Sequence, residues 1–176
     1  MSNQNLFAAL RAAFPKQLDQ IAIETDQGLR YSWRDLERAS AMIANLFDSL
    51  DIAAHSRVAV QVEKSVEALI LYLATLRAGH VFLPLNTAYQ SAEIEYFIGN
   101  AEPAVVVCSG GNHGWVSKIA FKAGTRYVFT LNDDRTGTLL DRSAAQSDRH
   151  QVAQRKADDL AAILYTSGTT GRSKGA

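Results

Sequence analysis

The stretch Leu160-Ala-Ala-Ile-Leu-Tyr165, followed by Thr166-Ser-Gly-Thr-Thr-Gly-Arg-Ser-Lys174, is the most informative part of this 176-residue sequence. The first run is apolar and predicts a strand. The second run combines two glycines, several hydroxyl side chains and a lysine. Glycines allow a tight fold in which successive N–H groups face one anion. Hydroxyl groups add hydrogen-bond donors, and the lysine adds a compact positive charge. The pattern therefore predicts a strand that leads into a phosphate-binding loop.

The lysine spacing excludes the Walker loop of P-loop NTPases, which needs a Gly-Lys-Ser/Thr triplet beginning five residues after the first glycine. Counting five residues from Gly168 arrives at Ser173, and from Gly171 at Ala176. A surface linker rich in Ser, Thr and Gly is the other alternative. The apolar strand directly upstream and the lysine at a short, fixed distance favour a binding loop. The candidate phosphate-binding residues are Thr166, Ser167, Gly168, Thr169, Thr170, Gly171 and Lys174.

Strands and helices alternate along the chain upstream of this loop. The strands expected from apolar and β-branched runs are 58–62, 81–84, 104–108, 127–129 and 160–165. The expected helices are 33–50, 66–78, a helix that starts at 91, and a weaker one at 116–122. A short-turn signal at Asp26-Gln27-Gly28 predicts a hairpin, and residues 131–159 are expected to form a surface loop with one short helix. Such alternation predicts an α/β fold with a mainly parallel sheet flanked by helices.

Capping residues place several helix ends. Ser32, with Asp35 three residues later, predicts a capping box. Ser65 and Ser91 are the expected N-caps of the next two helices, and Glu93 and Glu95 suit the positive end of the second one. Gly79 is the expected left-handed cap after residue 78.

The overall charge excludes some classes of partner. Lys plus Arg and Asp plus Glu number 18 each, so the net charge is zero, and no basic surface for nucleic acid or an anionic membrane is expected. Cys108 is the single cysteine, which rules out a disulfide within this sequence and favours a reducing compartment. The sequence has no secretory signal at its N-terminus and no apolar run of membrane-spanning length. We expect a soluble, cytoplasmic protein.

The segment Tyr165-Thr-Ser-Gly-Thr-Thr-Gly-Arg-Ser-Lys-Gly175 resembles the signature of the adenylate-forming superfamily, which includes acyl-CoA synthetases, peptide-synthetase adenylation domains and firefly luciferases. Leu76-Arg-Ala-Gly-His-Val-Phe-Leu-Pro-Leu85 and Leu29-Arg-Tyr-Ser-Trp-Arg-Asp-Leu36 are similar to two further segments of that family. All three occur in the family's order, so the resemblance covers essentially the whole chain.

Within the superfamily the sequence looks most like malonyl-CoA synthetases. The resemblance is carried by Pro84-Leu-Asn-Thr-Ala-Tyr89, Glu95-Tyr-Phe-Ile98 and Ala101-Glu-Pro103. Peptide-synthetase domains usually carry Asp where this chain has Asn86, which disfavours that branch.

The resemblance implies an acid–CoA ligase that works in two half-reactions. A carboxylate attacks the α-phosphate of Mg·ATP to give an acyl-adenylate and pyrophosphate, and the thiol of coenzyme A then takes the acyl group. The loop would hold the β- and γ-phosphates, Lys174 would balance their charge, and Thr166 would lie in the Mg²⁺ sphere. The implied partners are therefore a small carboxylic acid, ATP, Mg²⁺ and coenzyme A, with no nucleic acid and no membrane.

The resemblance also implies that residues 1–176 are the N-terminal portion of a large AMP-binding domain. The family's other motifs and its small C-terminal domain are absent, so no catalytic residue is expected in this chain and the chain alone should be inactive. The alternatives are another short- or medium-chain acyl-CoA synthetase, an adenylation domain that loads a carrier protein, or a fragment that binds nucleotide without catalysis.

Other signals have simpler interpretations. Ser109-Gly-Gly-Asn-His-Gly114 lacks the glycine spacing of a dinucleotide fingerprint and is expected to be a strand-exit turn. Cys108 is expected to be a buried structural thiol. The four histidines show no metal-ligand spacing, and His80 is given a structural role, with a place beside a pocket as the alternative. Asp133-Asp134 is expected in a solvated loop.

Overall fold

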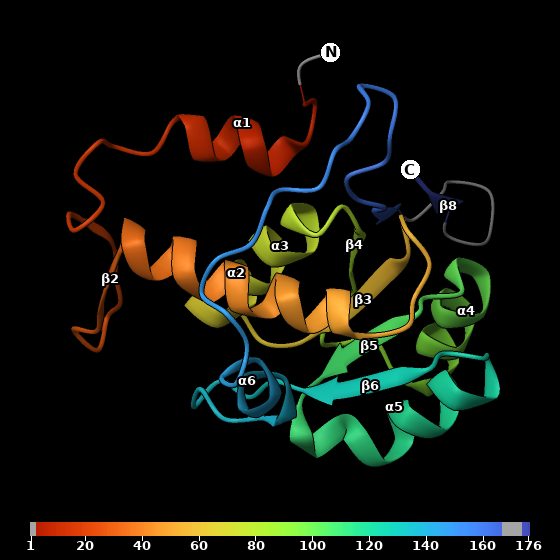
Figure 1. Cartoon of the computed structure of the whole chain (residues 1–176). Coiled ribbons are helices and arrows are strands. Elements are labelled where there is room, and N and C mark those ends of the chain that lie inside the picture. The colour runs from red at the N-terminus through yellow and green to blue at the C-terminus, as the bar shows by residue number, and fades with distance from the viewer. Residues whose placement is uncertain (1–2, 167–173) are drawn as a thin grey trace.

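A parallel sheet between two layers of helices forms the centre of the computed structural model, which describes residues 3–166 and 174–176 (Figure 1). The sheet has four strands in the order β4-β3-β5-β6, and each neighbouring pair is parallel. Its strands are β3 (Arg57–Gln61), β4 (Val81–Pro84), β5 (Val105–Cys108) and β6 (Tyr127–Thr130). The predicted α/β class is confirmed.

Helices cover both faces of the sheet, because parallel strands need crossover connections. The helices of one face are α1 (Leu6–Ala12), α2 (Trp33–Ser49), α3 (Val66–Arg77) and α6 (Thr138–Ser143), and those of the other are α4 (Ser91–Ala101) and α5 (Gly110–Lys122). In β5, Val105 and Val107 pack into the first layer, whereas Val106 and Cys108 pack into the second. All four residues are buried, as the continuous apolar run predicts.

Two helix starts lie where the sequence places them. At α2, Ser32 Oγ accepts a hydrogen bond from Asp35 N at 3.1 Å, and Ser32 N donates to Asp35 Oδ2 at 2.8 Å. At α3, Ser65 Oγ accepts from Ala68 N at 3.0 Å. These bonds satisfy N–H groups that have no partner inside the helix. The predicted capping box is therefore confirmed.

The predicted hairpin and the glycine cap are also confirmed. The hairpin is the antiparallel pair β1 (Ile21–Glu24) and β2 (Arg30–Ser32). Gly79 has a φ of 75°, and a Cβ at this position would lie 2.9 Å from Ala153 Cβ. The left-handed backbone and the close approach of residue 153 therefore both require glycine.

The prediction that Ser91 caps α4 is wrong by one residue. Gln90 is the N-cap, and its backbone N–H donates to Glu93 Oε2 at 2.9 Å. A carboxylate that satisfies the cap N–H belongs three residues after the cap, and Glu93 is in that position relative to Gln90. Glu95 points elsewhere and forms an ion pair with Lys122 of α5 at 2.8 Å.

The strand-exit turn expected at 109–114 is also wrong, because α5 begins at Gly110 and not near residue 116. Ser109 is its N-cap, and its hydroxyl accepts from Asn112 N at 3.3 Å. Asn132 Oδ1 accepts from Gly110 N at 2.7 Å. These two bonds satisfy N–H groups of the first turn and offset the low helix propensity of its glycines.

The strand expected over 160–165 is only partly present. Ala162 forms a single parallel bridge to Phe82 of β4, and the regular strand β7 contains only Tyr165–Thr166. Leu160 and Leu164 are 55% and 54% exposed, so this apolar run is not a fully buried strand. The chain leaves the sheet edge after Ile163, because the following residues pair with 174–176 instead.

None of the helices within residues 3–166 and 174–176 has the length and apolar character that crossing a bilayer requires.

Candidate functional site

The predicted phosphate-binding loop is held at both ends by a small antiparallel ladder. Strand β7 pairs with β8 (Lys174–Gly175), with Tyr165 opposite Gly175 and Thr166 opposite Lys174. One step further out, Leu164 and Ala176 exchange two backbone hydrogen bonds of 2.8 and 2.9 Å. Directly opposite residues project from the same face of such a ladder. Thr166 and Lys174, both exposed, therefore lie side by side at the entrance to the loop.

The other predicted loop residues, Ser167, Gly168, Thr169, Thr170 and Gly171, lie outside the described residues, and their role stays a prediction. The described part of the site thus brings together one hydroxyl and one ammonium group. These groups match the needs of a polyphosphate, for which the hydroxyl donates a hydrogen bond and the lysine supplies charge.

The ladder is attached to the edge of the main sheet. Phe82 N of β4 donates to Ala161 O at 3.0 Å, and Ile163 N donates to Phe82 O at 2.9 Å. These bonds place residues 161–163 beside β4 as a short extension of the sheet. The predicted phosphate-binding loop therefore begins a few residues after the edge of the main sheet.

Gly175 has a steric role in the ladder that its residue type and spacing alone do not predict. A Cβ on this residue would lie 2.9 Å from Ile163 Cγ2 and 3.6 Å from the ring of Tyr165. The first distance is shorter than real Cβ contacts allow, so a larger residue would move β8 away from β7. Since Gly175 follows Lys174, the glycine keeps the lysine in register with Thr166.

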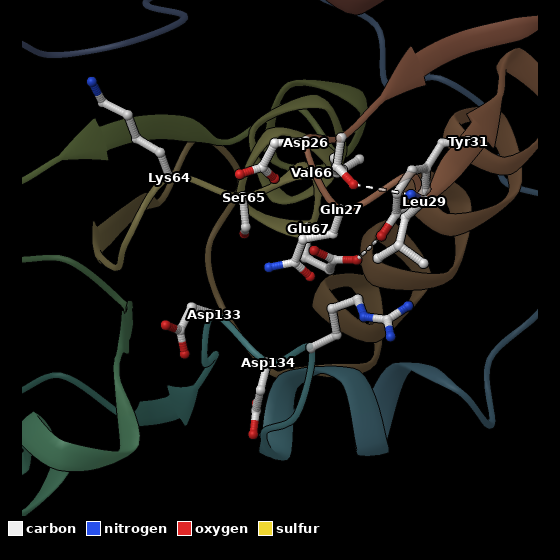
Figure 2. A pocket seen from close by; sticks show the side chains of 12 residues that line it. Asp26, Gln27, Leu29, Tyr31, Lys64, Ser65, Val66, Glu67, Asp133 and Asp134 are labelled. Carbon is white, nitrogen blue, oxygen red and sulfur yellow. Dashed lines mark hydrogen bonds between the residues drawn. The ribbon is translucent and has the colours of Figure 1, made fainter.

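A separate hollow of about 550 Å³ lies between the β1–β2 hairpin, the start of α3 and the loop after β6 (Figure 2). Tyr31 Oη donates to Glu67 Oε1 at 2.6 Å. Burial is the main cause that raises the pKa of Tyr31, and the Glu67 carboxylate acts in the same direction. Asp133 and Asp134 reach the hollow from an exposed loop, as predicted.

This hollow is separate from the predicted phosphate-binding loop. Its lining residues lie outside the β7–β8 ladder. Within residues 3–166 and 174–176, no cluster of three or more His, Cys, Asp or Glu side chains could hold a metal ion. Lys64, Ser65 and Arg135 also line the hollow, but they lie outside the segment whose sequence predicts phosphate binding. We therefore place the candidate site at the ladder, where Thr166 lies opposite Lys174.

Cys108 and His80 are both buried and packed in the fold, away from the ladder. Cys108 is fully buried, and burial raises the pKa of its thiol to about 12. A thiol in this state is protonated at neutral pH and is no nucleophile.

His80 packs edge-on against Phe47, with ring centroids 6.0 Å apart. It also lines a cavity of about 290 Å³ between α1, the end of α3 and residues 155–161.

The surroundings of His80 lead to a prediction about pH. Burial is the main cause that lowers the pKa of His80 from 6.5 to about 4; Arg155 and His55 act in the same direction, and Asp48 opposes them. Below pH 6.5 the unfolded chain binds a proton at this residue, whereas the folded chain does so only near pH 4. Stability should therefore fall by roughly 3 kcal/mol as the pH falls from 6.5 to 4, since one pKa unit corresponds to about 1.4 kcal/mol.

Urea unfolding at pH 7.5, 5.5 and 4.5 measures this effect. A His80→Leu variant should lose much less stability over that pH range than the parent protein does. A His113→Gln variant, altered in a half-buried histidine of α5, serves as the comparison. Parallel pH profiles for the parent and His80→Leu would contradict the assignment.

Comparison with known proteins identifies the class. A family model described as AMP-binding enzyme matches residues 10–176, so the chain belongs to the AMP-binding enzyme family. The resemblance to the adenylate-forming superfamily is thereby confirmed.

Comparisons with individual proteins add detail to this family assignment. ATP-bound MatB from Rhodopseudomonas palustris is 49% identical, with a TM-score of 0.93, over 99% of this chain and 34% of that chain. Tyrocidine synthase 1 from Brevibacillus parabrevis is 31% identical over 175 residues, which cover 99% of this chain and 15% of that protein. The anthranilate CoA ligase AuaEII, at 18% identity and a TM-score of 0.85, shares the fold. The chain thus spans only about a third or less of the length of these relatives.

Proposed function

We propose that this chain is the N-terminal portion of the large AMP-binding domain of an ATP-dependent acid–CoA ligase. In this proposal residues 166–174 hold the β- and γ-phosphates of ATP. The observation that carries it is the pairing of Thr166 with Lys174 across the ladder, in a chain that is 49% identical to a protein crystallised with ATP.

At the phosphate-binding loop the reaction needs positive charge to balance the departing pyrophosphate more than it needs a group that transfers protons. An oxygen of the substrate carboxylate attacks the α-phosphorus of ATP, the bond from that phosphorus to the bridging oxygen breaks, and pyrophosphate leaves with the electron pair. The thiolate of coenzyme A then attacks the acyl carbon, and AMP leaves. Lys174 would neutralise the charge that develops on the departing pyrophosphate, and the loop amides and hydroxyls would keep it in line.

Thr166 fits a place beside Mg²⁺. Its side chain offers a hard oxygen atom, which this ion prefers, and it is exposed next to the lysine that would bind the same phosphates. A single protein oxygen is sufficient where phosphates and waters supply the other ligands, as is usual for Mg²⁺ at nucleotide sites. When bound, the ion would add positive charge at the phosphate oxygens.

We propose malonate as the acid. The segments around Pro84, Glu95 and Ala101 resemble malonyl-CoA synthetases, and MatB, the neighbour at 49% identity, is of that kind. The lower identity to tyrocidine synthase 1, 31%, supports the carrier-loading alternative less. Asn86, where peptide-synthetase domains usually carry Asp, also disfavours that alternative; its Oδ1 accepts from Ala88 N at 2.9 Å in a local turn.

Exchange of labelled pyrophosphate into ATP by the full-length protein tests the function. Exchange should appear when malonate is added, and should be weaker with methylmalonate, acetate or an amino acid. Thioester formation should then require free coenzyme A. ATP turnover that is independent of any acid would contradict a ligase. Exchange with an amino acid, followed by loading of a carrier protein, would support the adenylation-domain alternative instead.

A further inference from the structure

The ring of Tyr165, the residue directly before the phosphate-binding loop, is held against helix α4. Its centroid is 4.5 Å from that of Phe97 and 6.4 Å from that of Tyr96. Its hydroxyl donates to Asn100 Oδ1 at 2.5 Å. Burial is the main cause that raises the pKa of Tyr165 above 10, so the hydroxyl keeps the proton that it donates. This contact joins residues 65 positions apart in the sequence.

The same ring also lies close to β8, the strand that follows the loop. Gly175 pairs with Tyr165 across the ladder, and a Cβ built on Gly175 would lie 3.6 Å from the tyrosine ring. The ring is therefore in contact with Phe97 of α4 and close to the backbone of β8. A single side chain thus locates both Thr166, which follows it in the chain, and Lys174, which precedes Gly175.

Helix α4, which supports this contact, is itself packed into the core. Phe97 is 2% exposed and belongs to the core beneath the helix. The ring of Tyr89 packs at a tilt against that of Phe97, with centroids 4.9 Å apart, and the backbone oxygen of Tyr89 accepts from Gln61 Nε2 of β3 at 3.1 Å. The ladder, in contrast, is short and has exposed residues, and a two-stranded pair of this kind is marginally stable alone. Its position should depend on the contact with the helix.

We propose that Asn100 and Tyr165, supported by Phe97, position Thr166 and Lys174 from α4 and thereby set the affinity for ATP. They are positioning residues, because they act through Thr166 and Lys174. This inference rests on the proposed function of the loop. Asn100 is well suited to a test, because it is exposed near the end of a helix and alanine favours the helix, so its loss should leave the fold intact.

The experiment uses the full-length protein with Asn100→Ala, Tyr165→Phe and the double variant. Each single change removes the same hydrogen bond, so the Kd of ATP, measured by calorimetry, and its KM in pyrophosphate exchange should rise roughly 3- to 10-fold. The double variant should be no worse than either single variant, because the two residues act as one unit. The kcat should change less than the KM.

Tyr31→Phe is the matched control. It removes a phenol hydrogen bond of 2.6 Å to a helix residue, Glu67, away from the ladder. It should affect the unfolding midpoint as Tyr165→Phe does and leave the Kd of ATP unchanged. An unchanged Kd in Asn100→Ala and Tyr165→Phe, or additive effects in the double variant, would overturn the inference. Lack of acid-dependent exchange in the parent protein would overturn the proposed function but not the calorimetric result.

Discussion

Replacing Lys174 by alanine in the full-length protein is expected to reduce acid-dependent pyrophosphate exchange roughly 10²- to 10³-fold, the usual cost of removing one preorganised group that stabilises developing charge. Lys174 is exposed, so the change should have little effect on folding. The loss should appear in both the KM of ATP and the kcat, because the charge on pyrophosphate grows as it departs.

The matched control is Lys122→Ala. Lys122 is also an exposed lysine, and it forms a surface ion pair with Glu95 at 2.8 Å, away from the ladder. Exposed pairs of this kind contribute about 0–1 kcal/mol to stability, so exchange should be unchanged. If the Lys174→Ala enzyme retained most of the parent's pyrophosphate exchange, the proposed role of the loop in the mechanism would be wrong.

Replacing Gly137 by alanine is expected to prevent folding or to destabilise the protein by about 3 kcal/mol or more, the range for strain that no neighbour can relieve. Gly137 has a φ of 136°, and a Cβ there would lie 2.3 Å from the backbone oxygen of Thr130. The chain is held in this position, since Thr130 and Thr138 bond to each other through backbone N–H and hydroxyl groups at 2.9 Å. A backbone oxygen at the end of β6 cannot move without disturbing the sheet.

Gly99→Ala provides the comparison. Gly99 lies inside α4, and a Cβ at this residue meets nothing within 4 Å. Alanine should stabilise the helix by up to about 1 kcal/mol. Urea unfolding midpoints, with the yield of folded protein as a second measure, distinguish the two glycines. Equal midpoints for the two variants would contradict the strain assigned to Gly137.

The sequence was sufficient to predict the class of fold for physical reasons. Strands buried on both faces need continuous apolar residues, and Val105-Val-Val-Cys108 has this character. Helix starts need acceptors for free N–H groups, which Ser32 and Ser65 supply. The start of α5 was missed because glycines normally disfavour helix, and the bond from Gly110 N to Asn132 depends on a residue 22 positions away.

The part of the candidate site that depends on residue types within one short segment could be predicted from the sequence. Thr166 and Lys174 were named from residue types and spacing, and the structure places them opposite each other. The contacts of Asn100 and Phe97 with Tyr165 are not predictable, because the pattern of α4 indicates only a helix that is buried on one side. Their contact with Tyr165 depends on the chain leaving the sheet edge after Ile163, which the apolar run 160–165 does not reveal.

The pairing of Thr166 with Lys174 makes the length of the intervening segment a requirement in its own right. A deletion between them must be absorbed either by the connecting segment or by a shift of the ladder register, and a shift of one residue moves the lysine to the opposite face. The composition would hardly change, yet after such a shift the cation would point away from the hydroxyl group. Mutagenesis that shortens or lengthens residues 167–173 should therefore be less tolerated than replacement of individual hydroxyl residues, and the count of residues becomes part of the motif.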